Sequence, residues 1–220
     1  MTQRSFADCR ALFHFMVGSS QDPFFDSLRR QYGEPRWPES PRECVVMGIR
    51  HEGKEVGFRE NTADDEIILC RLDSDGLPQS YTWPGTTEPG YFKEVINPQG
   101  DFKLNPGFYY FKPGTHKGVH PCLVQAAPVR GERAKKGKGF DYTDGQIWTI
   151  TDGSLHIHAG ILNDQNVGNW SAGCQVISGG WGGKPWGDFW KYIGLAIQSG
   201  QKIFTYILVD EATVKGVLGK

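Results

Sequence analysis

Hydrophobic positions recur with two different periods along this chain. Near its start, apolar residues occur every three or four positions from Phe6 to Met16, which is the spacing of one face of an α-helix. The Asp-Pro pair at 22–23 is a typical helix start, and Gly33 is placed to end the segment that follows. These features predict a pair of helices within residues 5–33.

Short β-branched and aromatic runs, separated by glycine, proline and aspartate, dominate the rest of the chain. They predict strands at 44–51, 66–72, 107–112, 121–127, 146–151 and 154–159. Only Asp152-Gly153 lies between the last two runs, so we expect these two to form one hairpin. A helical pattern at 186–200 then precedes a further strand at 202–209.

The pattern as a whole predicts a mainly β fold with a short helical N-terminal segment and one C-terminal helix. Because 220 residues are few for two full domains, we expect a single catalytic domain with a small accessory segment. The expected division is a helical segment and proline-rich linker at 1–43, followed by the catalytic domain at 44–220.

Composition narrows the classes of function. The formal net charge of −1 gives no overall attraction to nucleic acid or anionic lipid. We find neither an apolar run long enough to span a membrane nor the continuous apolar stretch of a secretory signal peptide. The five cysteines are odd in number and contain no CxxC pair, so we expect no disulfide framework, no zinc ribbon and at least one free thiol.

Candidate chemistry is concentrated in residues 154–178, where a predicted strand with two histidines leads through a glycine-containing loop to Cys174. A nucleophilic thiol requires a base or a cation beside it, and His158 can supply either. Small residues at 172 and 173 would let a carbonyl approach the sulfur. The backbone N–H groups of Gly173 and Cys174 could then bind the developing oxyanion. This combination predicts acyl transfer.

Three short stretches resemble the signature of L,D-transpeptidase catalytic domains, which are cysteine-dependent peptidoglycan enzymes. They are Ile157-His158-Ala159-Gly160, Val167-Gly168 and Ser171-Ala172-Gly173-Cys174, with twelve residues between His158 and Ser171. The resemblance implies a β-sandwich or barrel in which His158 activates Cys174. The thiolate would attack an L,D peptide bond of a peptidoglycan stem peptide and form a thioester. Transfer to an amine gives transpeptidation, and transfer to water gives L,D-carboxypeptidase or endopeptidase hydrolysis.

The same resemblance assigns supporting roles around the nucleophile. Ser171 would shape the turn, Gly173 would offer an oxyanion N–H, and a backbone carbonyl near Gly160 would orient the imidazole. Gln175 and Val176 stand where the family usually has an Ile-Arg pair. The missing arginine leaves open how a carboxylate of the acyl donor is held.

Several other residues are candidates for substrate binding. Trp170 adjoins the motif, and aromatic faces are common partners of sugars and aliphatic chains. Arg130 opens a basic loop at 129–139 that could attract stem-peptide carboxylates, and His116, like His120, could line the acceptor side. His156 lies two positions before His158, so both project from one face of a strand.

Two alternatives remain open. A zinc-dependent hydrolase could use His156, His158 and Cys174 as ligands, and a non-catalytic peptidoglycan-binding protein could retain the fold without turnover. The preferred hypothesis needs no cofactor, and its partners are peptidoglycan stem peptides rather than nucleic acid or membrane. We expect action in the periplasm or cell wall after delivery by another route, as for a bacteriophage or effector protein, with the delivery partner unidentified.

Overall fold

The computed structural model describes residues 3–51, 62–90, 99–134, 146–161 and 166–219. Its strands are β1 (Cys44–Arg50), β2 (Asp65–Leu72), β3 (Pro78–Thr86), β4 (Phe102–Leu104), β5 (Gly107–His116), β6 (His120–Gln125), β7 (Val129–Arg133), β8 (Ile147–Ile150), β9 (His156–Gly160), β10 (Gln175–Ser178) and β11 (Phe204–Asp210). Its helices are α1 (Phe6–Ser19), α2 (Pro23–Tyr32), the 3-10 helix η1 (Gly168–Trp170), α3 (Lys184–Gln198) and α4 (Glu211–Leu218). The fold is therefore mainly β, as the sequence pattern predicts.

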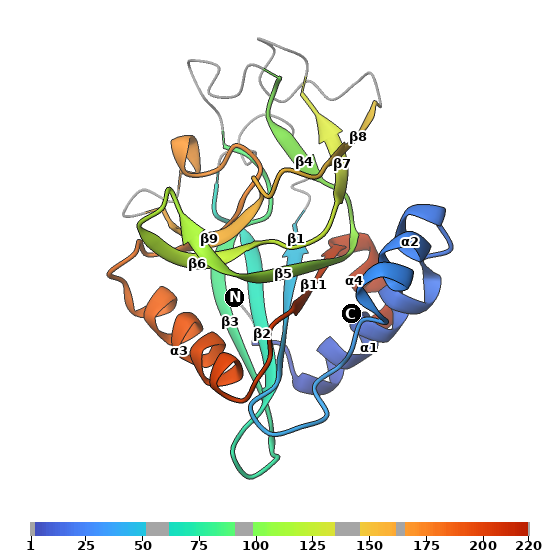
Figure 1. The fold of residues 1–220 in the computed structure, drawn as a ribbon, viewed down its shortest axis with the longest axis vertical. Coiled ribbons are helices and arrows are strands. Elements are labelled where there is room, and N and C mark those ends of the chain that lie inside the picture. Colours follow the sequence, from blue (N-terminus) through green and yellow to red (C-terminus); the bar gives the residue numbers. More distant parts are fainter. Residues whose placement is uncertain (1–2, 52–61, 91–98, 135–145, 162–165, 220) are drawn as a thin grey trace.

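Eight strands close into a barrel in the order β1-β11-β5-β6-β9-β10-β3-β2. The pairs β1·β11 and β9·β10 are parallel, whereas the other neighbours in the barrel are antiparallel. A separate three-stranded sheet, β4-β7-β8, lies above one end of the barrel in Figure 1. Parallel pairing of β9 and β10 is what sets the residues of the two strands side by side.

Helices cover the outside of the barrel, with α3 on one side and α1, α2 and α4 on the other (Figure 1). Every residue of β1 is buried, and Cys9, Leu12 and Phe13 of α1 belong to the same hydrophobic cluster as the barrel strands. The N-terminal helices therefore share the core of the barrel. No helix in the described ranges is long and apolar enough to cross a membrane.

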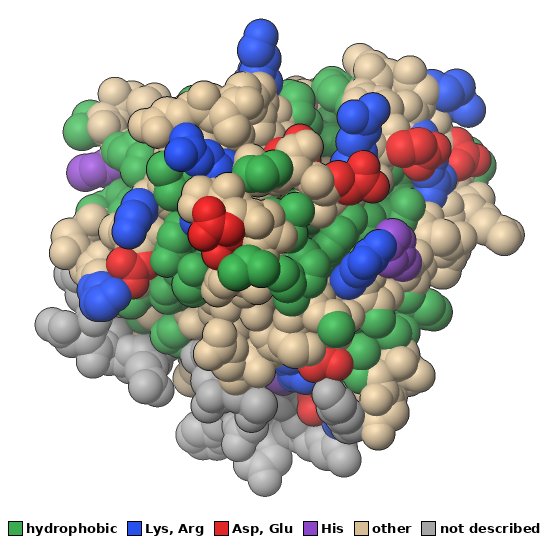
Figure 2. Space-filling view, turned by 90° about the horizontal axis from the view of Figure 1, so that it is seen from below, with side chains coloured by type: hydrophobic (Ala, Val, Ile, Leu, Met, Phe, Trp, Pro, Cys, Tyr) green, Lys and Arg blue, Asp and Glu red, His purple; other side chains and the backbone are tan. Residues whose placement is uncertain are grey.

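Charged side chains are mixed on the lower face of the molecule. Figure 2 shows Lys and Arg side chains interspersed with Asp and Glu around exposed hydrophobic groups, rather than collected into one area of a single sign. This mixture agrees with the net charge of −1. On this face, the charge pattern offers no extended basic surface of the kind that nucleic acids require.

The predicted hairpin between 146–151 and 154–159 is wrong. β8 pairs with β7 in the small sheet, whereas β9 pairs with β6 and β10 in the barrel. The side chain of Gln125, at the end of β6, separates the two segments: its Nε2 donates to the carbonyl of Ile150 (2.7 Å), and its Oε1 accepts from the N–H of Leu155 (3.4 Å). The Gln125 amide thus bonds to the backbone on both sides of the turn, where a hairpin would have direct strand-to-strand hydrogen bonds.

Other elements were not predicted. β3 contains Pro78 and Pro84, which argue against a strand in isolation, yet it pairs along its length with β2. A second C-terminal helix, α4, begins at Asp210, whose carboxylate accepts the N–H of Thr213 at 2.7 Å. The short strands β4, β7 and β10 also lack a clear period in the sequence.

Candidate active site

The proposed nucleophile and base lie on neighbouring parallel strands. In the β9·β10 register, Ile157 is opposite Gln175 and His158 is opposite Val176. Cys174 directly precedes β10 and thus lies beside His156. Because side chains alternate between the two faces of a strand, Cys174 projects from the same face as both histidines. The fold therefore brings the three sequence-predicted residues together on the outside of the barrel.

The thiol of Cys174 is partly accessible and lies against the backbone at the start of β9. Its Sγ is 3.9 Å from the carbonyl oxygen of Ser154, and the N–H of His156 is directed at the sulfur. Burial raises the pKa of Cys174 to about 11, although the His156 N–H and the charge of Lys117 act in the opposite direction. At neutral pH the resting group is therefore a thiol.

His158 is almost completely buried, with 2% of its surface exposed. Its Nδ1 lies 2.8 Å from the carbonyl oxygen of Ala159, which only accepts, so Nδ1 carries the proton. Nε2 then holds a lone pair, and this buried atom has no hydrogen-bond partner among the described residues. Burial is the main reason that the pKa of His158 is lowered to about 3; the hydrogen bond to Ala159 acts in the opposite direction, and nearby His116, His156 and Lys117 add to the lowering. The imidazole is neutral and has one unoccupied acceptor.

No hydrogen bond joins His158 to Cys174 in the described structure. The sulfur contacts the backbone of Ser154 and His156, while Nε2 of His158 is unpartnered. The two groups thus share a face but rest apart and uncharged. Proton transfer between them requires Sγ and Nε2 to come within hydrogen-bonding distance.

Aromatic rings cover His158. His116, from the end of β5, stacks on it with ring centroids 4.3 Å apart, and Nδ1 of His116 is 2.9 Å from Nδ1 of His156. Nε2 of His156 donates to the carbonyl of Gly153 (3.2 Å), so His116 is the donor in the pair. Trp181 lies nearly parallel to His158 at 5.7 Å and stacks on His120 at 4.4 Å.

The turn before the nucleophile is held by its own serine. Ser171 Oγ donates to the carbonyl of Cys174 (2.7 Å) and accepts the N–H of Gly173 (3.1 Å). Gly173 has φ +137° and no room for a side chain, because a Cβ would lie 2.5 Å from the carbonyl oxygen of Phe102. The Gly173 N–H therefore already has a partner in this structure, and its expected oxyanion role stays a prediction that requires the Ser171 hydroxyl to give way.

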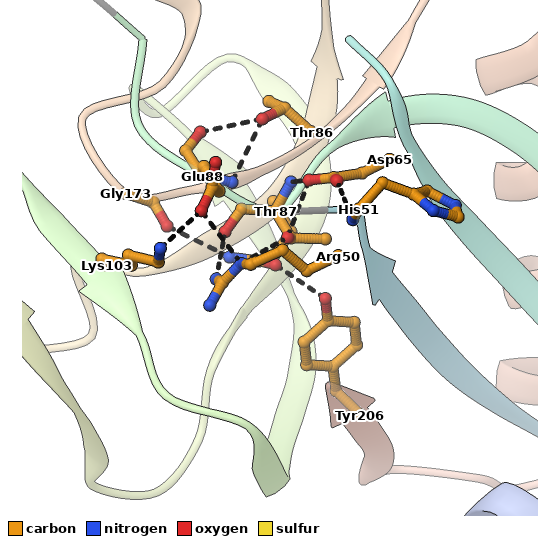
Figure 3. A network of polar contacts seen from close by, with 10 residues as sticks. Arg50, His51, Asp65, Thr86, Thr87, Glu88, Lys103, Gly173 and Tyr206 are labelled. Atoms are coloured by element: carbon orange, nitrogen blue, oxygen red, sulfur yellow. Dashed lines mark hydrogen bonds and ion pairs between the residues drawn. The ribbon is translucent and has the colours of Figure 1, made fainter. Parts of the chain in front are cut away.

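Gln175, one of the residues expected to bind substrate or to support the site, lies inside the barrel. Its fully buried side chain points into the barrel, where Oε1 accepts from the hydroxyl of Tyr206 (2.6 Å) and Nε2 donates to the carbonyl of Gly173 (3.1 Å). Figure 3 shows Tyr206 and Gly173 at the two ends of this connection. Gln175 therefore supports the turn from the interior.

A buried charged network lies beside this connection (Figure 3). Arg50, 2% exposed, donates to the carbonyl of Thr87 at 2.8 Å, and Asp65 accepts the Thr87 N–H at 2.7 Å. Burial raises the pKa of Asp65 to about 6. The network fixes the chain just before Gly90, whose N–H donates to the carbonyl of Ser171 (2.7 Å). The sequence analysis did not identify these residues, because their partners are distant along the chain.

Arg130 is also not at the site. Its guanidinium pairs with the carboxylate of Asp22 and lies over the ring of Phe24 at 5.6 Å, which ties β7 to the start of α2. The remaining expected lysines of the 129–139 loop, at 135, 136 and 138, lie outside the described residues. Arg130 was predicted to attract substrate, but it forms a structural ion pair with Asp22 instead.

Trp170 and Gly160 form the packing around the nucleophile. Trp170 and Cys174 both pack against a small hydrophobic cluster that contains Val176. A Cβ on Gly160 would lie 2.7 Å from Val176 and 2.9 Å from Trp170, so only glycine fits. The imidazole is oriented by the carbonyl of Ala159, not of Gly160, whose carbonyl accepts from the N–H of Gly180 (3.0 Å).

The alternative zinc site gains no support from the geometry. Within the ranges that the structure describes, no group of three or more His, Cys, Asp or Glu side chains could hold a metal ion. His156 uses its Nδ1 for His116 and its Nε2 for Gly153, which leaves no free lone pair for a metal. The histidines are arranged to bind one another and the backbone.

Comparison with known proteins adds no family to this picture. No family model matches the sequence, and neither a curated protein nor a solved structure is significantly similar to it. The chemistry must therefore be argued from the site. That site consists of a partly accessible thiol, a buried neutral imidazole on the adjacent strand, and a cover of aromatic rings.

Proposed function

We propose that the protein is a peptidoglycan-modifying cysteine enzyme that cleaves or exchanges L,D peptide bonds of stem peptides. Cys174 is the nucleophile and His158 is the base. One observation carries the proposal: the two residues share one face of adjacent parallel strands, and the Ala159 carbonyl fixes the imidazole so that Nε2 holds the lone pair. The resemblance of residues 157–174 to L,D-transpeptidases supplies the bond type and the substrate class.

The reaction proceeds in two acyl-transfer steps. The Cys174 thiol gives its proton to Nε2 of His158 as the sulfur attacks the peptide carbonyl. The tetrahedral intermediate collapses with cleavage of the C–N bond, and the imidazolium returns the proton to the leaving amine, which leaves a thioester. An amine of a second stem, or water, then attacks the thioester and restores the thiol, with His158 again serving as base.

The resting pair places a constraint on the first step. Burial favours the neutral form of both groups, so a preformed thiolate-imidazolium pair is disfavoured before substrate binds. Proton transfer is therefore coupled to attack. It also requires Sγ and Nε2 to come within hydrogen-bonding distance when substrate binds.

The proposed substrate sets the place of action. Stem peptides are found in the periplasm or cell wall, so the protein acts there. A bacteriophage lysin or a delivered effector fits this place of action. Fractionation that finds the protein only in the cytoplasm, without contact with peptidoglycan, would contradict this part of the proposal.

A peptidoglycan-binding protein without turnover is the second candidate. The observation that favours it is the absence of a hydrogen bond between Cys174 and His158 in the described structure, with both groups neutral. Retention on purified peptidoglycan without any new product would support this candidate against the enzyme.

Product analysis with a matched thiol control tests the enzymatic proposal. Purified muropeptides are incubated with the wild type, Cys174→Ala and Cys44→Ala, and the products are identified by mass spectrometry. Cys44 is a suitable control because it is a buried free thiol on β1, three strands from β10 in the barrel order, and burial raises its pKa well above the ordinary value. We expect product from the wild type and Cys44→Ala only, abolished by iodoacetamide and unaffected by chelator. Equal product from Cys174→Ala would refute the assignment.

A further inference from the structure

Lys117 occupies an unusual position at the tip of the β5–β6 hairpin. It has φ +51° and is followed by Gly118 with φ +72°, and the N–H of Val119 closes the turn on the carbonyl of His116 at 3.1 Å. Such positions favour glycine, asparagine or aspartate, and a lysine there is uncommon. A charged side chain therefore occupies a turn position that usually carries a small or short polar residue.

The hairpin tip lies over the candidate active site. His116, directly before Lys117, stacks on His158 and bonds to His156, whose backbone N–H is directed at the Cys174 sulfur. The hairpin tip is thus joined to the nucleophile through His116 and His156. Lys117 itself is exposed, and no hydrogen bond or ion pair of its ammonium group is found in the described part of the chain.

Lys117 carries the fixed positive charge nearest to the site along the hairpin. Its ammonium group acts electrostatically on Cys174, His158 and His116, and among the described residues it is the only charged side chain that does so on the thiol. In the described part of the chain, the other groups that act on this thiol and these two imidazoles are backbone groups and neighbouring histidines, with no carboxylate among them. A free cation without a protein anion is suited to an anionic ligand.

We infer that Lys117 binds a carboxylate of the acyl donor beside Cys174 and so selects donors that carry a negative charge next to the reacting carbonyl. The acyl donor in this inference rests on the proposed function. The anion site does not, because it follows from the hairpin geometry and the unpaired ammonium group. Lys117 is a specificity residue, since it contacts the substrate but takes no part in bond cleavage.

Two alkylating reagents of similar size and different charge test the site without any peptidoglycan. Iodoacetate is anionic and iodoacetamide is neutral, and both react with the thiolate of Cys174. The other four cysteines are buried, and the rate remaining in Cys174→Ala is subtracted. The rates are measured for the wild type, Lys117→Met, Lys117→Arg and Lys112→Met. Lys112 is an exposed lysine of β5, the strand that leads to Lys117, and it has no electrostatic effect on the thiol. Lys112→Met therefore controls for the loss of one positive charge.

The ratio of the two rates separates anion binding from a general effect on the thiol. We expect Lys117→Met to lower the iodoacetate-to-iodoacetamide ratio about fivefold at low salt, and less at high salt. Lys117→Arg and Lys112→Met should keep the wild-type ratio. An unchanged ratio in Lys117→Met would overturn the inference. If both rates fall by the same factor, so that the ratio stays the same, the lysine only promotes ionisation of the thiol.

Muropeptide kinetics connect the site to the proposed function. If the protein is active, Lys117→Met should raise KM for donors with a free carboxylate and leave KM for amidated donors unchanged. If no turnover occurs while the reagent ratio still depends on Lys117, the proposed function fails and the anion site stands. If turnover occurs and the reagent ratio does not depend on Lys117, the anion site fails and the proposed function stands.

Discussion

Replacement of His158 by asparagine should flatten the dependence of stability on pH. Burial lowers the pKa of His158 from 6.5 to about 3. The unfolded chain therefore binds a proton at this residue below pH 6.5, whereas the folded protein does not until about pH 3. Stability from this group is fully present above pH 6.5 and is lost as the pH falls through that window. Between pH 7 and pH 5 the loss amounts to about 2 kcal/mol.

Asparagine is the informative substitution because its amide can still donate to the Ala159 carbonyl but does not titrate in this range. Urea unfolding, followed by tryptophan fluorescence, gives the free energy of unfolding at pH 7 and pH 5 for the wild type and His158→Asn. The variant loses packing equally at both pH values, and His116 and His156 titrate in both proteins. These contributions cancel when the change in unfolding free energy between pH 7 and pH 5 is compared between the two proteins. We expect the loss between pH 7 and pH 5 to be about 2 kcal/mol smaller in the variant. Equal losses would refute the assignment of His158 as a neutral, buried base.

Three further predictions concern the nucleophile and its turn. Because burial raises the pKa of Cys174 to about 11, its alkylation rate with iodoacetamide should still increase above pH 9, and a plateau by pH 9 would contradict this value. Gly173→Ala places a Cβ 2.5 Å from the Phe102 carbonyl at φ +137°, and should cost about 2–3 kcal/mol in urea unfolding, whereas a change below about 0.5 kcal/mol would show that the turn adapts. Tyr206→Phe should cost about 1–2 kcal/mol because it removes the donor to Gln175, and adding Gln175→Leu should cost less than the sum of the two single changes; strict additivity would argue against their hydrogen bond.

The local elements were predictable because their signals are local. Asp22 accepts the N–H of Phe24 at the start of α2, as an Asp-Pro helix start indicates, and the apolar face from Phe6 to Met16 is buried in the core. The runs at 44–51 and 202–209 became β1 and β11, two strands that are buried almost throughout. Caps and hydrophobic periods are properties of short segments, and they suffice for these elements.

The errors arise where a distant residue decides the structure. Gln175 was expected to bind substrate or to support the site, and strand alternation turns it into the barrel, where Tyr206 satisfies its amide. Arg130 was expected to attract substrate carboxylates, yet Asp22 and Phe24, at the start of α2, bind it. Neither partner can be identified without the fold.

One part of the candidate site could be predicted from the sequence, and another part depends on distant residues. The resemblance to the L,D-transpeptidase signature implied that His158 and Cys174 act together, and parallel pairing of β9 and β10 places them on one face. The cover of His116 and the cation of Lys117 come from the β5–β6 hairpin, far from these residues along the chain, and had no joint signal in the sequence with Trp181. The alternation of histidines at 116 and 120 around a glycine turn was the only local indication of that cover.

The most direct test of the central claim is a search for the thioester itself. The wild type and Cys174→Ala are mixed with purified stem peptides, quenched in acid within seconds and weighed intact by mass spectrometry, and the adduct is then located by peptide mapping. The account predicts an added mass equal to the acyl part of the donor, attached at Cys174 and released by hydroxylamine. Product formation without any such adduct, or the same adduct in Cys174→Ala, would contradict nucleophilic catalysis by this residue.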